Sequence, residues 1–178
     1  MSDPAHFDPI ISELEKDGPI KLDIGSGGPV FERRDMTWKT VDKFASADIT
    51  ADMWDLPFED GTVDAIWCSH ALEHVDIVKV IPTLKEWFRV LKSGGICNVM
   101  VPDFDYIAQH WIEYGPRGGA LGMIYGNQVH EGEYHKVAFN EDSLVEDFKE
   151  VGFDVLESKT LWTEEYTMYS AWVIGKKP

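Results

Sequence analysis

The stretch that decides the fold of this chain is Ile20-Lys21-Leu22-Asp23-Ile24-Gly25-Ser26-Gly27-Gly28. A short apolar segment here runs directly into glycines, which predicts a buried strand followed by a tight turn. Because glycine has no Cβ, the backbone at such a turn can approach a bound molecule closely. Two further acids, Asp42 and Asp52, follow at predicted strand ends, where a carboxylate can hold a ribose diol or an ammonium group. The sequence therefore predicts a nucleoside-binding edge.

Strand-like and helix-like apolar patterns alternate along the rest of the chain, with no internal repeat and no linker. The predicted strands are residues 20–24, 39–42, 47–51, 63–68, 96–101, 154–160 and 169–174, and the predicted helices are residues 9–15, 82–91 and 141–151. Such alternation is typical of α/β folds. The last two strands have no helix between them, which predicts that they are antiparallel. We therefore expect one α/β domain, residues 1–178, with a mostly parallel twisted sheet, an antiparallel last strand and helices on both faces.

The composition excludes several classes of function. The 178 residues contain 16 Lys and Arg against 32 Asp and Glu, a net charge of −16. Binding to a phosphate backbone needs clustered basic residues, so we expect neither nucleic acid nor a membrane as a partner. A basic leader and an apolar run of about 20 residues are both missing, which favours the cytoplasm. Cys68 and Cys97 lie in apolar strands and are expected to be reduced packing residues.

Three motifs carry a resemblance to a known family. Asp23-Ile24-Gly25-Ser26-Gly27 follows the pattern acid-x-Gly-x-Gly, residues 56–74 read LPFEDGTVDAIWCSHALEH, and residues 89–95 read RVLKSGG. With these motifs the chain resembles the class I S-adenosylmethionine-dependent methyltransferases, and within them a compact type 11-like branch. The resemblance implies a Rossmann-like methyltransferase fold. Pro29 departs from the family's third glycine, and Val30 argues against a nicotinamide-binding Gly-x-Gly-x-x-Gly loop.

The resemblance also implies a cofactor, S-adenosylmethionine, with S-adenosylhomocysteine as the product. The residues expected to bind the cofactor are Asp23, Gly25, Ser26, Gly27, Asp42, Asp52, Met53, Ser69, His70 and Leu72. Each of the acids has an alternative role, either as a cap of the glycine turn or as a solvated loop residue. Leu72 could equally be a core residue.

The expected catalytic residues are histidines. A sulfonium methyl group is already activated, so the protein mainly has to orient the acceptor atom and remove its proton. Residues 102–139 are expected to form a substrate lid, and residues 1–19 an N-terminal cap. Within the lid, His135 or His130 is the candidate general base, and His74 could act on the substrate side. The alternative is that these histidines are hydrogen-bonded loop residues. The spacing of His and Cys predicts no metal site.

Two functions remain open at this point. The first is methyl transfer from S-adenosylmethionine to an O or N atom of a small-molecule or sugar-containing acceptor. The second is a non-catalytic module that binds S-adenosylmethionine or S-adenosylhomocysteine and acts through a protein partner. A nicotinamide-dependent reductase is disfavoured by Val30. The sequence permits a homodimer but does not predict one.

Overall fold

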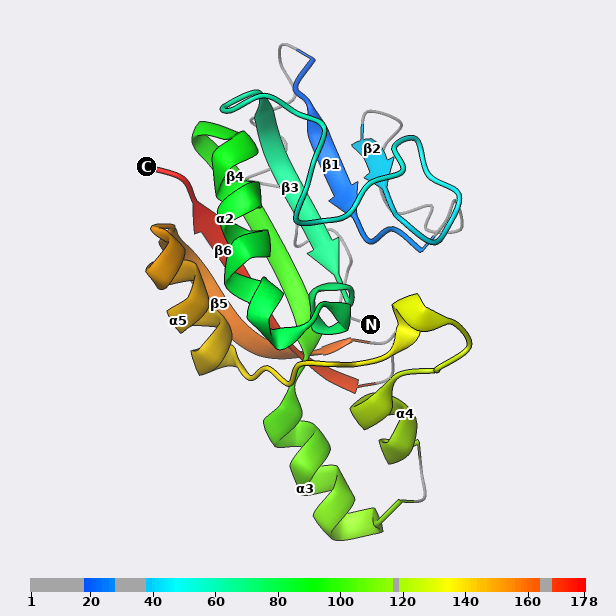
Figure 1. Cartoon of the computed structure of the whole chain (residues 1–178). Helices are drawn as coiled ribbons and strands as arrows, with labels where there is room; N and C mark the ends of the chain where they lie inside the picture. Colours follow the sequence, from blue (N-terminus) through cyan, green and yellow to red (C-terminus); the bar gives the residue numbers. More distant parts are fainter. Residues whose placement is uncertain (1–17, 28–37, 117–118, 164–167) are drawn as a thin grey trace.

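The computed structural model in Figure 1 describes residues 18–27, 38–116, 119–163 and 168–178. They form a six-stranded sheet of order β2-β1-β3-β4-β6-β5. The strands are β1 (Lys21–Ile24), β2 (Trp38–Val41), β3 (Val63–Ser69), β4 (Leu91–Pro102), β5 (Asp154–Thr163) and β6 (Met168–Lys176). The first four are parallel, and β6 is antiparallel to both of its neighbours, β4 and β5. The predicted α/β class and the antiparallel last strand are confirmed.

β1 lies inside the sheet and fixes the place of the site. All four of its residues are buried, and Ile24 pairs with Val41 of β2 on one side and with Cys68 of β3 on the other. The chain leaves β1 toward β2 and later crosses to β3, so the strand order reverses at β1. The carboxyl ends of these three strands point to one edge of the sheet (Figure 1). Ligands of open α/β sheets bind at such an edge, outside the strand ends.

Two helices, α2 (Val80–Val90) and α5 (Glu141–Val151), pack side by side on one face of the sheet (Figure 1). Each contributes fully buried side chains to the main core, Leu84 and Trp87 from α2 and Leu144 and Phe148 from α5. The predicted N-cap of α5 is confirmed, because Asn140 accepts a hydrogen bond from Ser143 N.

The opposite face of the sheet carries a second apolar cluster. It consists of Ile96 and Met100 of β4 with Trp172 and Ile174 of β6, all buried. These side chains alternate along β4 with those that enter the main core, as the period of a strand requires. Both faces of the sheet therefore carry buried apolar side chains. The predicted helix at residues 9–15, and nearly all of the predicted N-terminal cap, lie outside the described residues.

Two predicted elements are corrected by the structure. Residues 47–51 do not form a strand, since only Ile49 bridges to β2. The Asp48 carboxylate accepts hydrogen bonds from Thr40 N (2.9 Å) and Thr40 Oγ1 (2.9 Å), so a side chain takes up a β2 amide that a further strand could have used. The helix predicted to include Leu91 ends at Val90, and Leu91 begins β4.

The predicted lid segment, residues 102–139, contains helices that sequence patterns did not reveal. They are α3 (Phe104–Tyr114), α4 (Ala120–Tyr125) and a short 3₁₀ turn, η5 (Glu131–Glu133). The segment lies below the carboxyl edge of the sheet in Figure 1. Asp103 joins it to the sheet, because its buried carboxylate accepts from Tyr106 N (3.0 Å) at the start of α3 and from Thr160 Oγ1 (2.8 Å) of β5.

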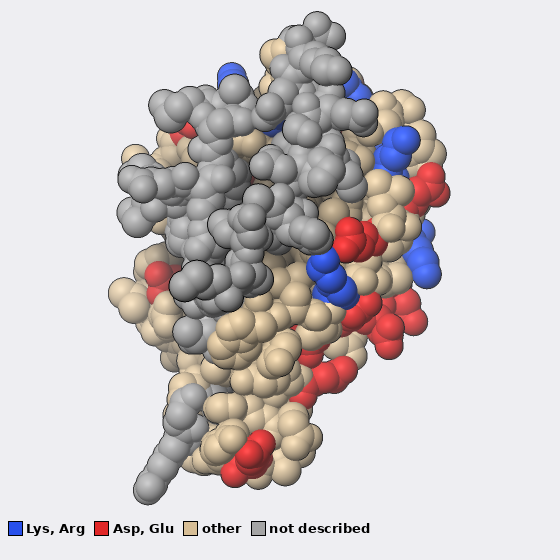
Figure 2. Space-filling model, turned by 180° about the vertical axis from the view of Figure 1, so that it is seen from behind, with Lys and Arg blue, Asp and Glu red and all other residues tan. Residues whose placement is uncertain are grey.

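The surface reflects the acidic composition. On the face shown in Figure 2, acidic side chains gather along one side and the lower edge, with separate basic side chains among them. No helix within the described ranges is long and apolar enough to cross a membrane.

Candidate functional site

The glycine turn after β1 is held in place from two sides. Gly25 N donates to Val41 O (2.8 Å), and Gly27 N donates to Asp42 Oδ2 (3.0 Å). Both glycines have left-handed backbones, with φ of 71° and 67°. A Cβ at Gly25 would lie 2.2 Å from Cβ of Ala71, so the turn also packs closely against the segment that follows β3. The turn is thereby fixed at the carboxyl edge.

Asp42 anchors the turn through backbone amides. Its Oδ2 accepts from Gly27, and its Oδ1 accepts from Phe44 N (2.7 Å) and Ala45 N (2.8 Å). The predicted ribose-binding acid therefore also organises the loop around it. Accepting hydrogen bonds from these amides is the alternative role of Asp42 as a loop acid. It is compatible with the predicted role in ribose binding, since each carboxylate oxygen has two lone pairs.

The other predicted cofactor residues differ in their surroundings. Asp52 Oδ1 pairs with Lys43 Nζ at 2.8 Å, and the carbonyl of Met53 accepts from Trp87 Nε1 (2.8 Å). Asp23 and Ser26 are buried, and the Ser26 hydroxyl has no hydrogen-bond partner in the described part of the chain. Such an orphaned polar group calls for an explanation, and a bound ligand is one.

For Leu72 the structure agrees with the alternative of a core residue. It is fully buried in the main core, in the short 3₁₀ turn η3 (Leu72–His74), so its side chain packs among apolar neighbours and is not presented to a ligand.

Ser69 ends β3, and the next residue, His70, has a left-handed φ of 53°. The ring of His70 points into the protein, with Nε2 3.0 Å from Ser170 Oγ and Nδ1 3.8 Å from a Glu73 carboxylate oxygen. Burial lowers the pKa of His70 to about 3, with help from the charges of His135 and His74. The ring of His70 therefore contacts Ser170 and Glu73, and its contact with the cofactor stays a prediction. Strained non-glycine backbones of this kind gather at functional sites.

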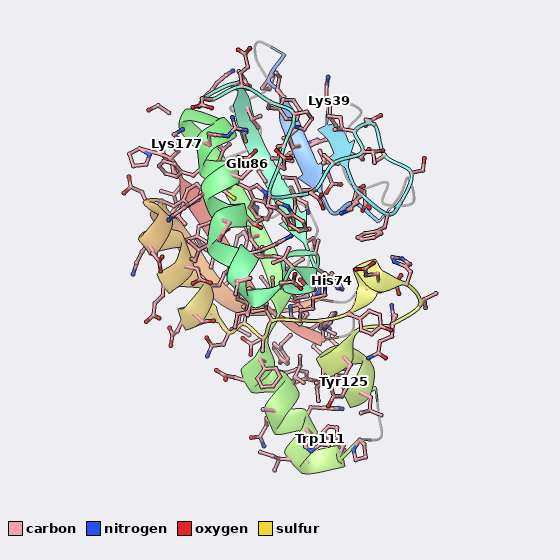
Figure 3. The ribbon with its side chains drawn as sticks, in the orientation of Figure 1. Lys39, His74, Glu86, Trp111, Tyr125 and Lys177 are labelled. Atoms are coloured by element: carbon pink, nitrogen blue, oxygen red, sulfur yellow. The ribbon has the colours of Figure 1, made fainter. Side chains whose placement is uncertain are left out.

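Glu73 is the centre of a cluster that the sequence analysis missed. Its carboxylate is buried, and neither oxygen has a hydrogen-bond partner among the residues that the structure describes. Nε2 of His74 and Nε2 of His135 each lie 4.0 Å from Glu73 Oε1. The two imidazole rings also meet edge to face, with centroids 4.9 Å apart. Figure 3 labels His74, the last residue of η3, which follows β3.

Burial controls the protonation of this cluster. It raises the pKa of Glu73 to about 8. It also lowers the pKa of His74, although the carbonyls of Tyr134 and His70 act in the opposite direction. For His135, burial and then the charge of His74 lower the pKa, against the carbonyl of Met123. Around neutral pH both rings are therefore neutral and can accept a proton or a Lewis acid.

The backbone of the lid segment holds His135 beside Glu73. Lys136 N (2.8 Å) and Val137 N (3.2 Å) both donate to Glu73 O, and His135 N donates to Tyr125 O (3.1 Å). These bonds join the end of β3 to the end of α4. His135 thus reaches the cluster from a distant part of the chain, and no local spacing of His or Cys could have revealed it.

His130, the other predicted base, lies apart from the cluster. Its ring is half exposed, with Nε2 3.3 Å from Glu133 Oε1 and Nδ1 accepting from Gly132 N (3.1 Å). The ring also lies against Phe44, with centroids 5.6 Å apart. The structure therefore brings His74 and His135 together and leaves His130 at the surface.

A hollow of about 190 Å³ opens beside His135. Its walls come from Pro102, from α3 and α4, and from residues 135–138. A second, more apolar hollow of about 330 Å³ adjoins it and shares Phe104, Ile107, Ile124 and Tyr125. Trp111 and Tyr125, both labelled in Figure 3, line this second hollow from α3 and α4. The lid segment therefore has a mostly apolar pocket whose lining includes His135.

Comparisons with known proteins agree with this architecture. The model of the "Methyltransferase domain" family matches residues 33–99. A search of curated proteins found no match. A solved S-adenosylmethionine-dependent methyltransferase from Methanosarcina mazei is similar to this chain, with a TM-score of 0.64, 17% identity, and coverage of 95% of this chain and 97% of that one.

Two further solved structures widen the comparison. The 1,6-didemethyltoxoflavin-N1-methyltransferase of Burkholderia thailandensis, with bound 1,6-didemethyltoxoflavin and S-adenosylhomocysteine, has a TM-score of 0.63 at 12% identity and covers 98% of this chain and 79% of its own. A Haloferax volcanii putative methyltransferase in complex with the Trm112 methyltransferase activator has a TM-score of 0.63 at 17% identity, covering 95% and 87%. From the strand order, the family match and these neighbours, the chain has the class I, Rossmann-like methyltransferase fold.

Proposed function

We propose that this protein is an S-adenosylmethionine-dependent methyltransferase that acts on an O or N atom of a small-molecule or sugar-containing acceptor. The observation that carries the proposal is the carboxyl edge itself. There the glycine turn is anchored by Asp42 and packs against Ala71. Ala71 is three residues from His74, the histidine expected on the acceptor side. The apolar hollow of the lid segment is lined by His135, which lies beside the same cluster. A nucleoside cofactor and an acceptor can meet at this edge.

The cofactor would lie along the glycine turn. Gly25 and Gly27 allow a close approach of the backbone, and Asp42 and Asp52 supply carboxylates for the ribose hydroxyls and the adenine amino group. Asp23, Ser26, Met53 and Ser69 complete the set. The match to the methyltransferase family over residues 33–99 supports S-adenosylmethionine as this cofactor, as does the neighbour that was crystallised with S-adenosylhomocysteine.

The acceptor would enter the hollow beside His135. Its walls are mostly apolar, which suits a small organic acceptor, and its volume of about 190 Å³ admits only part of a larger one. His135 lines this hollow, and His130 does not. We therefore assign the removal of the acceptor proton to the cluster that contains His135, with His74 behind it.

Calorimetry with purified protein tests the cofactor. S-adenosylmethionine and S-adenosylhomocysteine should bind, and NADH should not. Asp42→Ala removes the acceptor of Gly27 N together with a ribose contact, so binding should weaken by about 1–3 kcal/mol. The matched control is Asp48→Ala, which also removes a carboxylate that accepts a backbone amide of this region, but away from the glycine turn. Equal losses in both variants, or no binding of either ligand, would contradict the proposal.

Turnover separates this function from the alternative of a non-catalytic binding module. Formation of S-adenosylhomocysteine should be followed with panels of hydroxyl and amine acceptors, sugars included. Binding of the cofactor without turnover of any acceptor would favour the module that acts through a protein partner.

A further inference from the structure

The buried carboxylate of Glu73 lacks the partners that a buried charge requires. It is 1% exposed, and neither oxygen is hydrogen-bonded to any residue that the structure describes. Isolated carboxylates in protein interiors are costly, and those that persist are paired, protonated or bound to a metal. Ring nitrogens of three histidines lie 3.8–4.0 Å from the carboxylate, too far for direct hydrogen bonds. The space among these atoms is where an occupant would fit.

In His74 and His135, the ring nitrogen farther from Glu73 makes a hydrogen bond, and this bond shows which nitrogen carries the lone pair. His74 Nδ1 is 3.1 Å from Tyr134 O, and His135 Nδ1 is 2.8 Å from Met123 O. A carbonyl oxygen can only accept, so Nδ1 carries the proton in both rings. In the neutral rings each Nε2 then has a free lone pair, and both of these atoms face Glu73. Histidines that bind metals are typically held in this way, by a hydrogen bond from the other ring nitrogen to a carbonyl or carboxylate.

We propose that Glu73, His74 and His135 form a binding site for one divalent transition-metal ion. One ligand atom from each of the three residues lies within 4.8 Å of the other two. Two imidazoles and one carboxylate are a donor set that suits zinc and neighbouring first-row metals, and three protein ligands leave a coordination position open. A divalent cation would also supply the positive charge that the buried carboxylate lacks.

The geometry requires only a small contraction. Bonds of about 2.1 Å at a tetrahedral ion place two ligand atoms roughly 3.4 Å apart. The observed separations from Glu73 Oε1 are 4.0 Å to each Nε2. Rotation of the carboxylate and small tilts of the two rings bring these atoms to bonding distance, while the Nδ1 hydrogen bonds keep the rings facing inward.

The ion would change how the acceptor proton is removed, an inference that rests on the proposed function. His135 lines the acceptor hollow, so the open coordination position would lie next to it. The cation would acidify an acceptor hydroxyl bound beside it, and the proton would pass to solvent water, because the Nε2 lone pair of His135 would hold the ion. Binding of the ion itself does not depend on this role.

Metal binding should be measured directly on full-length protein without a histidine tag, after removal of metals by a chelator. Co²⁺ reports His and carboxylate ligands through its visible d–d absorption, and Zn²⁺ binding is measured by calorimetry. We expect one ion per chain. Glu73→Gln and His135→Ala should each weaken binding at least about tenfold, since they remove a direct ligand. His130→Ala, which removes a surface histidine, should bind as tightly as the unaltered protein.

Two outcomes would overturn the proposal: no binding of Co²⁺ or Zn²⁺, or binding that is unchanged in both Glu73→Gln and His135→Ala. Circular dichroism checks the folding of each variant. If Glu73→Gln or His135→Ala does not fold, metal binding is measured on His74→Ala in its place. Titration of the metal-free protein with S-adenosylmethionine keeps the two proposals apart. Metal binding without binding of S-adenosylmethionine would contradict the proposed function but support the metal site. Binding of S-adenosylmethionine without metal binding would contradict the metal site but support the proposed function.

Discussion

At residue 25 the absence of a side chain is a structural requirement. A Cβ there would meet Ala71 at 2.2 Å, and the φ of 71° is unfavourable for alanine. Gly25→Ala should therefore lower the free energy of unfolding by at least about 1–3 kcal/mol, as expected for a strained backbone, and weaken cofactor binding as well. Urea denaturation measures the first effect.

Gly61→Ala is the matched control for this prediction. Gly61 has a similar φ of 66°, but a Cβ there would have no heavy atom within 4 Å. It should therefore carry the backbone cost without the clash. If the two variants lose the same stability, the contact with Ala71 is not what requires glycine at residue 25.

The two lid histidines should differ in their effect on activity. His135 lies 4.0 Å from Glu73 and lines the acceptor hollow, whereas His130 is at the surface beside Glu133. With an acceptor found in the screen, His135→Ala should lower kcat by about 10²–10⁴-fold, the usual contribution of proton transfer. His130→Ala should retain nearly full kcat. The affinity for S-adenosylmethionine should be the same in both variants, and a full kcat in His135→Ala would remove this residue from the mechanism.

At the scale of elements, Glu86 and Arg89 join α2 to the loop before β3. Glu86 Oε1 accepts from Leu56 N (2.8 Å), and Arg89 donates to both Glu86 oxygens and to Phe58 O (2.9 Å). The hydrogen bond from Arg89 is the main cause that lowers the pKa of Glu86 below its ordinary value of 4.5. The ionised form is therefore stabilised by folding.

A pH series tests this connection. Because the pKa is lowered in the folded state, the stabilisation is present above pH 4.5 and is lost as the pH falls through the lowered pKa. At pH 7, Glu86→Gln should lose about 1–3 kcal/mol of unfolding free energy, and the difference from the unaltered protein should shrink in acid. Glu59→Gln, at an exposed acid of the same loop, is the control. A difference that stays constant down to pH 3 would contradict the assignment.

The elements that could be predicted are those with a complete local signal. The turn after β1, the alternation in β3 and the capped ends of α5 all depend on neighbouring residues. Residues 47–51 also looked like a strand, but the side chain of Asp48 took the place of a strand partner. The helices of the lid segment were missed because their exposed apolar residues, such as Trp111 and Ile112, gave no one-sided stripe.

The candidate site was only partly predictable for a related reason. The glycine turn is a local motif and Asp42 follows it by 15 residues at the next strand end, and the structure joins the two by a hydrogen bond. The cluster around Glu73 depends on hydrogen bonds from Lys136 and Val137 to the Glu73 carbonyl, which are long-range contacts. Burial of Glu73 between distant segments leaves no pattern in the sequence. The sequence therefore predicts the glycine turn and its anchor better than the cluster around Glu73.

At the scale of the whole molecule, the acidic charge and the layered sheet fit a protein that handles small ligands at one edge. The net charge of −16 opposes contact with nucleic acid, and the face in Figure 2 carries its acidic groups along one side and the lower edge. The glycine turn follows β1 and the histidine cluster begins just after the neighbouring strand β3, so both lie at the carboxyl edge of the sheet, above residues 102–139 in Figure 1.

Because β6 lies between β4 and β5 in the sheet, these strands cannot pair in the order in which they are synthesised. A ribosome makes β5 before β6, yet among the described strands β5 pairs only with β6, and β4 keeps an open edge until Met168–Lys176 arrives. Residues up to Lys176 must therefore emerge before the sheet can close. During that interval the apolar edge of β4 can pair with other chains, so yield on overexpression should depend on translation speed and on chaperones more than on the stability of the finished fold.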